Sequence, residues 1–348
     1  MSMNPDLTGL GVGLLAFVVG FASQRGSVCG VLAARQIVET GRASRLVAFL
    51  TASLWALVVV VPMVWLLPDR FKLIPSYVGA AAALLGGALY GAGTVVNGAC
   101  VFGTASRALS GNLSFFAALP GIAVGAGLGA SLGIPPLRTE QTGSPLLEPS
   151  FGSVVLLLLA TAEVLAALIG IARSLRQAGL TMSRLLRAAR WRNSLAMMVI
   201  GVCGGLLFAA GGPWSYPSLL RQLGNLAFGR PASFAAVTII GPLALLAGGS
   251  VAALAGGRFV LRALSPIQIG RSFLGGVMMG VAATLIPGGN DVLLLSALPS
   301  FAAHGALAYP AMIAVQLALL FCVKLWKDRS ARAWSANLRA GKALAPAS

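Results

Sequence analysis

Apolar runs of membrane-spanning length alternate with short polar segments along the whole chain. A transmembrane helix needs about 20 consecutive, predominantly apolar residues. Nine segments approach this length, at residues 8–23, 46–67, 77–96, 113–133, 151–172, 194–211, 232–255, 272–287 and 306–325. The pattern predicts an all-α polytopic membrane protein with about nine transmembrane spans.

Four glycine-rich signatures interrupt these apolar segments. They are GFASQRGSVCG (20–30), GAGTVVNGACVFGTASRA (91–108), GLLFAAGGPWSY (205–216) and GVAATLIPGGND (280–291). Broken backbone at membrane depth is tolerated only where protein buries it or where it lines a cavity. We therefore expect discontinuous or re-entrant helices that meet at mid-membrane, above all in the first, sixth and eighth segments, which are short and glycine-rich. Tight helix packing explains many of the 44 glycines, but not the polar residues beside these breaks.

Composition excludes a soluble domain. Charged residues make up 9% of the chain and hydrophobic residues 57%, whereas soluble domains carry about 25% charged residues. The net charge of +17 does not indicate a nucleic-acid partner, because the basic residues gather in particular loops. Most of the 25 Lys and Arg fall on one side of the membrane if the N-terminus lies outside. The positive-inside rule then places the C-terminus in the cytoplasm.

The longest basic segment divides the chain near its centre, and each half carries two signatures. We expect residues 1–173 and 193–326 to be oppositely oriented halves of an inverted repeat, an architecture that recurs in transporters. Residues 174–192 would form a basic cytoplasmic linker and residues 327–348 a basic cytoplasmic tail. Residues 134–150 form a polar, proline-containing loop on the outside.

The four cysteines match no zinc or haem spacing, so we expect neither a metal site nor a cofactor. Cys203 and Cys322 lie inside apolar runs and are expected to pack as small hydrophobic residues. Cys29 and Cys100 instead follow glycine-bearing breaks, where their thiols would face a cavity. Thiols are weak donors, and helix N-termini attract anions without fixed charge. Together they suit a large, polarizable sulfur-containing anion that must bind and then leave.

Polar and glycine residues beside the breaks are the further candidates for substrate binding. They are Gln24, Arg25, Asn97, Gly98, Gly288, Gly289 and Asn290. Arg25 is either an electrostatic attractor for the anion or an anchor at the inner surface. Asn97 either donates to the anion or ends a helix.

Three other polar residues carry separate expectations. Glu163, inside the fifth segment, would pair with an arginine or carry a proton. Asp291 is expected near the outer mouth, capping the helix that follows. His304 is expected in an exposed loop.

At these motifs the chain resembles the YeeE/YedE family of bacterial inner-membrane proteins, whose characterised members take up thiosulfate. The segments GFASQRGSVCG and NGACVFGTASRALSGN look like the first two cysteine loops of the family. The resemblance covers nearly the whole chain and implies that Cys29 and Cys100 contact the substrate, with thiosulfate passing between cysteines through S–H···S contacts. It also implies a bacterial inner-membrane location and a cytoplasmic TusA-like sulfur carrier as partner. In that membrane the outside N-terminus expected from the Lys and Arg distribution would be periplasmic.

The last loop departs from the family pattern. This loop usually carries a third cysteine in a pattern close to GGCN, whereas residues 287–291 here read PGGND, with Gly289 at the place of the thiol. A relay of three thiols is therefore not expected. The protein would use two thiols with backbone donors at 288–290, or it would carry a different sulfur species. The third signature has no cysteine, and its Trp214 would plug or line the path.

Three functions compete. The first is inward transport of a sulfur-containing anion, with thiosulfate the favoured substrate. The second is a membrane sulfurtransferase partner that carries persulfide on Cys29 or Cys100, which requires an accessible thiolate in an electropositive setting. The third is a channel or assembly subunit whose breaks serve only packing. The chain contains no nucleotide-binding P-loop motif, and we do not expect it to be an enzyme.

Overall fold

The computed structural model describes residues 5–77, 79–132, 141–177, 179, 182–286 and 288–343. Within them, eight helical segments are long and apolar enough to cross a membrane. The number rises to nine if the bent pair at Pro266–Leu285 and Asn290–Ala297 counts as one span. The prediction of an all-α polytopic membrane protein with about nine spans is confirmed.

The helices run in chain order as two series. The first comprises α1 (Pro5–Gly26), α2 (Gly30–Thr40), α3 (Ser44–Leu66), α4 (Ala80–Asn97), α5 (Val101–Leu109), the 3-10 turn η1 (Leu113–Ala117) and α6 (Ala118–Ser131). The second comprises α7 (Phe151–Gln177), α8 (Met182–Arg187), α9 (Asn193–Gly211), α10 (Tyr216–Ala227), α11 (Ala236–Ala255), α12 (Pro266–Leu285), α13 (Asn290–Val292), the π-helical turn η3 (Leu293–Ala297) and α14 (Ala303–Ala343). Two-residue strands, β1 (Ser76–Tyr77) and β2 (Gln141–Thr142), pair antiparallel.

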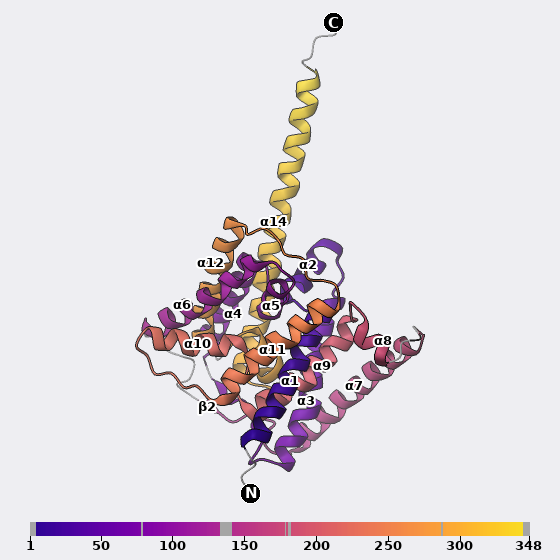
Figure 1. Ribbon diagram of the computed structural model, residues 1–348, viewed down its shortest axis with the longest axis vertical. Helices are drawn as coiled ribbons and strands as arrows, with labels where there is room; N and C mark the ends of the chain where they lie inside the picture. The colour runs from indigo at the N-terminus through magenta and orange to yellow at the C-terminus, as the bar shows by residue number, and fades with distance from the viewer. Residues whose placement is uncertain are drawn as a thin grey trace.

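The N-terminus and the C-terminal helix lie at opposite ends of the bundle (Figure 1). Helix α14 projects from the upper end and continues through residues of the predicted tail, away from the other helices. Strand β2 lies at the lower end and belongs to the predicted polar loop 134–150, of which residues 134–140 lie outside the described part.

Each of the four signatures coincides with a break between two helices. The breaks fall at residues 27–29, 98–100, 212–215 and 286–289, the last of which includes one residue that is not described. Breaks were expected above all after the first, sixth and eighth apolar segments, which are short. The third apolar segment is also followed by a break, between α4 and α5. Gly98 and Gly212 have φ values of +81° and +77°, a conformation that ends an α-helix and favours glycine.

Glycine lets the helix backbones touch. A Cβ added at Gly20 of α1 would overlap the carbonyl oxygen of Leu245 in α11, and one at Gly125 of α6 would overlap that of Val277 in α12. Such contacts exclude any side chain, which is the packing expected between helices in lipid.

Several major helix contacts pair a helix of the first series with one of the second, and these contacts come in matching pairs. Helix α1 packs on α11, and α9 packs on α3; α6 packs on α12, and α14 packs on α4. Helix α7 lies outside this arrangement and packs mainly on α3. Only 17% of its most apolar stretch is buried, against 33% to 56% for the other spans. Glu163 lies on an exposed part of this peripheral helix.

Candidate functional site

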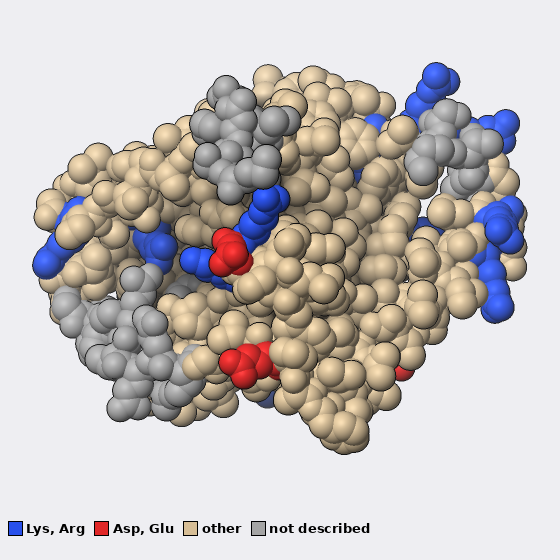
Figure 2. Space-filling view, turned by 90° about the horizontal axis from the view of Figure 1, so that it is seen from below, with Lys and Arg blue, Asp and Glu red and all other residues tan. Residues whose placement is uncertain are grey.

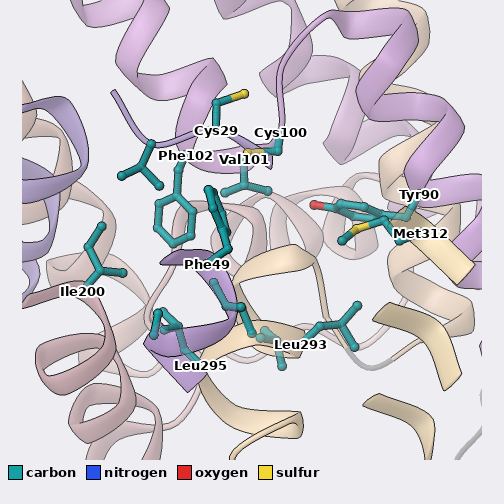
Figure 3. Packing of buried hydrophobic residues seen from close by; sticks show 14 of the residues in the cluster. Cys29, Phe49, Tyr90, Cys100, Val101, Phe102, Ile200, Leu293, Leu295 and Met312 are labelled. Atoms are coloured by element: carbon teal, nitrogen blue, oxygen red, sulfur yellow. The ribbon is translucent and has the colours of Figure 1, made fainter. Parts of the chain in front are cut away.

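The two signature cysteines lie side by side in the centre of the protein (Figure 3). Cys29 is the residue before α2, and Cys100 is the residue before α5. The backbone N–H of Gly30 donates to the Cys100 Sγ over 3.1 Å. The exposed fractions are 3% for Cys29 and 0% for Cys100. Two breaks that are 70 residues apart in the chain thus form one buried thiol pair.

Two other signatures also reach this region. The Tyr216 hydroxyl, at the start of α10, donates to the carbonyl of Val101 over 2.7 Å. A Cβ added at Gly30 would lie 3.9 Å from both the Cys100 Sγ and the Asn290 Nδ2. Because Cys29 and Cys100 are the N-cap residues of α2 and α5, the positive N-terminal ends of these two helices lie beside the thiol pair, an arrangement that favours an anion.

Asn290 has a buried amide with no hydrogen-bond partner for either its nitrogen or its oxygen among the described residues. An unpaired buried polar group is costly, and most such groups in proteins have a partner. The amide nitrogen and the Cys100 Sγ are equally close to a Cβ built at Gly30, so an unused donor lies in the region of the thiol pair.

Asp291 is fully buried in the first turn of α13. Gly288 and Val292, which lie on either side of it in the chain, line the lower cavity, so Asp291 is close to that cavity without lining it. Its role as a helix cap stays a prediction. Beside Asp291, a Cβ added at Gly289 would lie 2.6 Å from the Tyr90 Oη and 2.7 Å from the Asp291 Oδ1. The place of a third thiol is thus occupied by these two polar groups.

Two cavities approach the centre from opposite ends. The upper cavity, of about 510 Å³, reaches Cys29 and is lined by loops near the end from which α14 projects. The lower cavity, of about 330 Å³, reaches Gly288 and Val292 at the last break. Figure 2 looks onto the lower end and shows Lys and Arg side chains, with an acidic one beside them, at a hollow in that face. Lys72 and Arg221 are basic residues of the lower cavity.

Gln24, Asn97 and Gly98 shape the breaks and are absent from the linings of both cavities. The Gln24 Nε2 donates to the Ser110 Oγ over 2.8 Å. The Asn97 Nδ2 donates to the Ala99 carbonyl and to the Thr104 Oγ1, over 2.8 and 2.7 Å. Their amides are thus used, at least in part, to hold the backbone that presents the thiols.

Arg25 is buried and is absent from both cavity linings. Its guanidinium lies 5.1 Å from the centre of the Phe21 ring, and its nitrogens have no hydrogen-bond partner among the described residues. Arg25 is therefore not an anchor at the inner surface, and its role as an electrostatic attractor for the anion stays a prediction.

Sequence reasoning missed the arginines of the upper cavity, which are Arg107, Arg190, Arg258 and Arg262. Arg258 donates to the Gln24 carbonyl over 3.2 Å and to the Ser27 Oγ over 2.9 Å, so it ties its loop to the first break. Burial, followed by the charges of Arg190 and Arg25, lowers the pKa of Arg258. No sequence signal separated these residues from other loop arginines, because the positive-inside rule accounts for all of them equally.

Three other expectations have clear outcomes. His304 is fully buried near the start of α14, where its Nδ1 accepts a hydrogen bond from the Tyr77 N–H over 3.4 Å. The expectation that His304 lies in an exposed loop is therefore wrong. Trp214 is also fully buried and packs on Phe208, outside both cavities. Glu163 lines neither cavity and has no arginine partner among the described residues.

A family model described as sulphur transport matches residues 25–317, which is most of the chain. A search of curated proteins returned no match. The matched range contains both cysteine breaks, both cavities and the convergent helix ends. The chain therefore belongs to the sulphur transport family, the YeeE/YedE family of membrane transporters for sulfur compounds.

Proposed function

We propose that this sulfur-compound transporter takes up thiosulfate through the centre of the bundle. The observation that carries the proposal is the position of the Cys29–Cys100 pair between two cavities with basic linings. The anion enters the lower cavity, passes Asn290 and Cys100, reaches Cys29 and leaves through the upper cavity.

The chemistry of this path suits a sulfur anion. The anion must exchange its water for protein donors, and the convergent helix N-termini, the Asn290 amide and the thiols are such donors. Weak and multiple contacts favour release, because conduction requires an ion to bind and to leave each site. Thiol donors to a polarizable sulfur atom meet this requirement better than a close guanidinium contact.

The missing third thiol has a structural substitute. The Tyr90 hydroxyl lies next to Gly289, and the Tyr90 side chain points toward the side on which Cys100 lies (Figure 3). We assign to Tyr90, with the backbone at 288–290, the contact that a third cysteine would make. A hydroxyl donates more strongly than a thiol, so the path keeps a donor at this point.

We further propose that the lower cavity opens to the periplasm and the upper cavity to the cytoplasm of a bacterial inner membrane. The crowding of basic residues into loops on the α14 side supports this orientation. The matching pairs of helix contacts support an inverted repeat of residues 1–173 and 193–326. A TusA-like carrier would meet the transported sulfur at the upper cavity.

The alternative function, a sulfurtransferase partner with a persulfide on Cys29 or Cys100, is less well supported. A protein partner must bring its own thiol within bonding distance of the acceptor sulfur, and both sulfurs here are almost fully buried. A small anion reaches Cys29 through the upper cavity without such access.

Reconstituted uptake tests the proposal. Proteoliposomes that contain the purified chain should accumulate ³⁵S from thiosulfate well above the level of empty liposomes. Sulfate, which has no terminal sulfur to contact a thiol, should be taken up much more slowly. The intact mass of the protein should stay unchanged after transport. Absence of uptake contradicts transport, and a stable mass increase of one sulfur atom favours the sulfurtransferase.

A further inference from the structure

The upper cavity has a strongly basic lining. Four arginines line it, together with serines and Asn112, and none of the described residues in its lining is Asp or Glu. Its volume of about 510 Å³ is several times that of a small tetrahedral anion. Its lining extends from Cys29 to Arg190 and Arg262. It is therefore a compartment with its own recognition chemistry.

The arginines differ in how far their guanidinium groups are already engaged. Arg258 is bound to the first break through the Gln24 carbonyl and Ser27. Arg107 lies over the Phe115 ring, 5.0 Å from its centre. Among the described residues, Arg107, Arg190 and Arg262 are not paired with any carboxylate. Three guanidinium groups are thus left to bind an anion.

Electrostatics favour a divalent ligand. Like charges gathered in a partly enclosed cavity repel one another, and the resulting potential raises the local concentration of anions. Guanidinium groups bind oxyanions through paired, charge-assisted hydrogen bonds. A divalent oxyanion compensates more of this charge than chloride does, and it offers several acceptor oxygens.

We propose that the upper cavity is a second anion site, separate from the thiol pair, in which Arg107, Arg190 and Arg262 bind a divalent sulfur oxyanion through its oxygens. The site deepens the proposed function, on which it rests for the class of ligand. Because it contacts oxygen and not sulfur, it accepts sulfate as readily as thiosulfate. Sulfate that accumulates on the α14 side would occupy it and slow the release of transported thiosulfate.

Equilibrium binding of ³⁵S-sulfate to the purified full chain, at fixed ionic strength in chloride, tests the site. Wild type should bind one sulfate. The variant Arg107→Gln/Arg262→Gln should bind sulfate at least about tenfold more weakly. Each hydrogen bond to a charged group contributes enough free energy to change the Kd by about tenfold. Arg190→Gln should also weaken sulfate binding. Because Arg190 lies in an exposed loop, this variant tests the site even if the double variant does not fold.

Two controls make the result specific. Arg173→Gln removes an exposed arginine of α7 that is absent from the cavity lining, and it should bind sulfate like wild type. Cys29→Ala/Cys100→Ala should also retain sulfate binding, because the site does not use the thiols. Unchanged binding in the arginine variants, or its loss in the cysteine variant, overturns the proposal. Normal thiosulfate uptake by the cysteine variant would instead contradict the proposed thiol path and leave the sulfate site intact.

Discussion

Removal of either central thiol is expected to abolish most thiosulfate uptake. In Cys29→Ala or Cys100→Ala, a buried donor between the two cavities is lost. Loss of a hydrogen bond to a charged partner costs about 1.5–3 kcal/mol, which corresponds to a fall of about tenfold to a hundredfold or more. Uptake of ³⁵S from thiosulfate into proteoliposomes measures the effect, with the amount of inserted protein as the reference.

The other two cysteines are matched controls for this experiment. Cys203 is partly buried in α9 and Cys322 is exposed on α14, and neither lines a cavity. Cys203→Ala and Cys322→Ala should transport at close to the wild-type rate. Wild-type uptake in both Cys29→Ala and Cys100→Ala would remove the thiols from the mechanism.

Displacement of the Cys29 thiol should be nearly as damaging as its removal. The variant Gly103→Ala keeps all four cysteines, but its new Cβ would lie 2.5 Å from the Cys29 Sγ and 2.9 Å from the Cys29 Cβ. One of the two breaks must therefore shift, because real Cβ atoms do not approach so closely. We expect thiosulfate uptake to fall by about tenfold or more, since misplacement of a reactive group by about 1 Å can cost a hundredfold.

A second glycine-to-alanine change isolates this steric effect. Gly170 lies on the exposed side of α7, and a Cβ there would meet no atom within 4 Å. Gly170→Ala should leave uptake unchanged and should not lower thermal stability, because alanine favours a helix interior over glycine. If Gly103→Ala transports like Gly170→Ala, the close packing of α5 against Cys29 is not needed for transport.

The breaks and the thiol pair were predictable because lipid imposes a strong rule on the backbone. Glycine and polar groups at membrane depth require shelter, so Cys29 and Cys100 beside two breaks had to lie in protein or at a cavity. The chemistry of a thiol then indicated which of the sheltered residues would meet a sulfur anion. The rule does not itself bring the two thiols together, and their contact follows from how the helices pack.

The partners of individual polar side chains were not predictable in the same way. Asn97 and Gln24 have donors that suit an anion, but both donate to protein groups instead. The Asn97 acceptor at Ala99 is local, whereas the Gln24 acceptor, the Ser110 hydroxyl, is 86 residues away in the chain. His304 is buried because β1 supplies a donor to its ring, a contact across 227 residues of chain. The arginines of the upper cavity are distinguished from other loop arginines only by the packing of α5 and the loop after α11.

Reversible cross-linking of the two central cysteines tests the central claim most directly. In the Cys203→Ala/Cys322→Ala protein, mild oxidation should join Cys29 and Cys100 in a disulfide that mass spectrometry of the digested protein identifies. The cross-link should stop thiosulfate uptake, and dithiothreitol should restore it. Failure of the two cysteines to form a disulfide, or full uptake by the cross-linked protein, would contradict a passage that runs between these sulfurs.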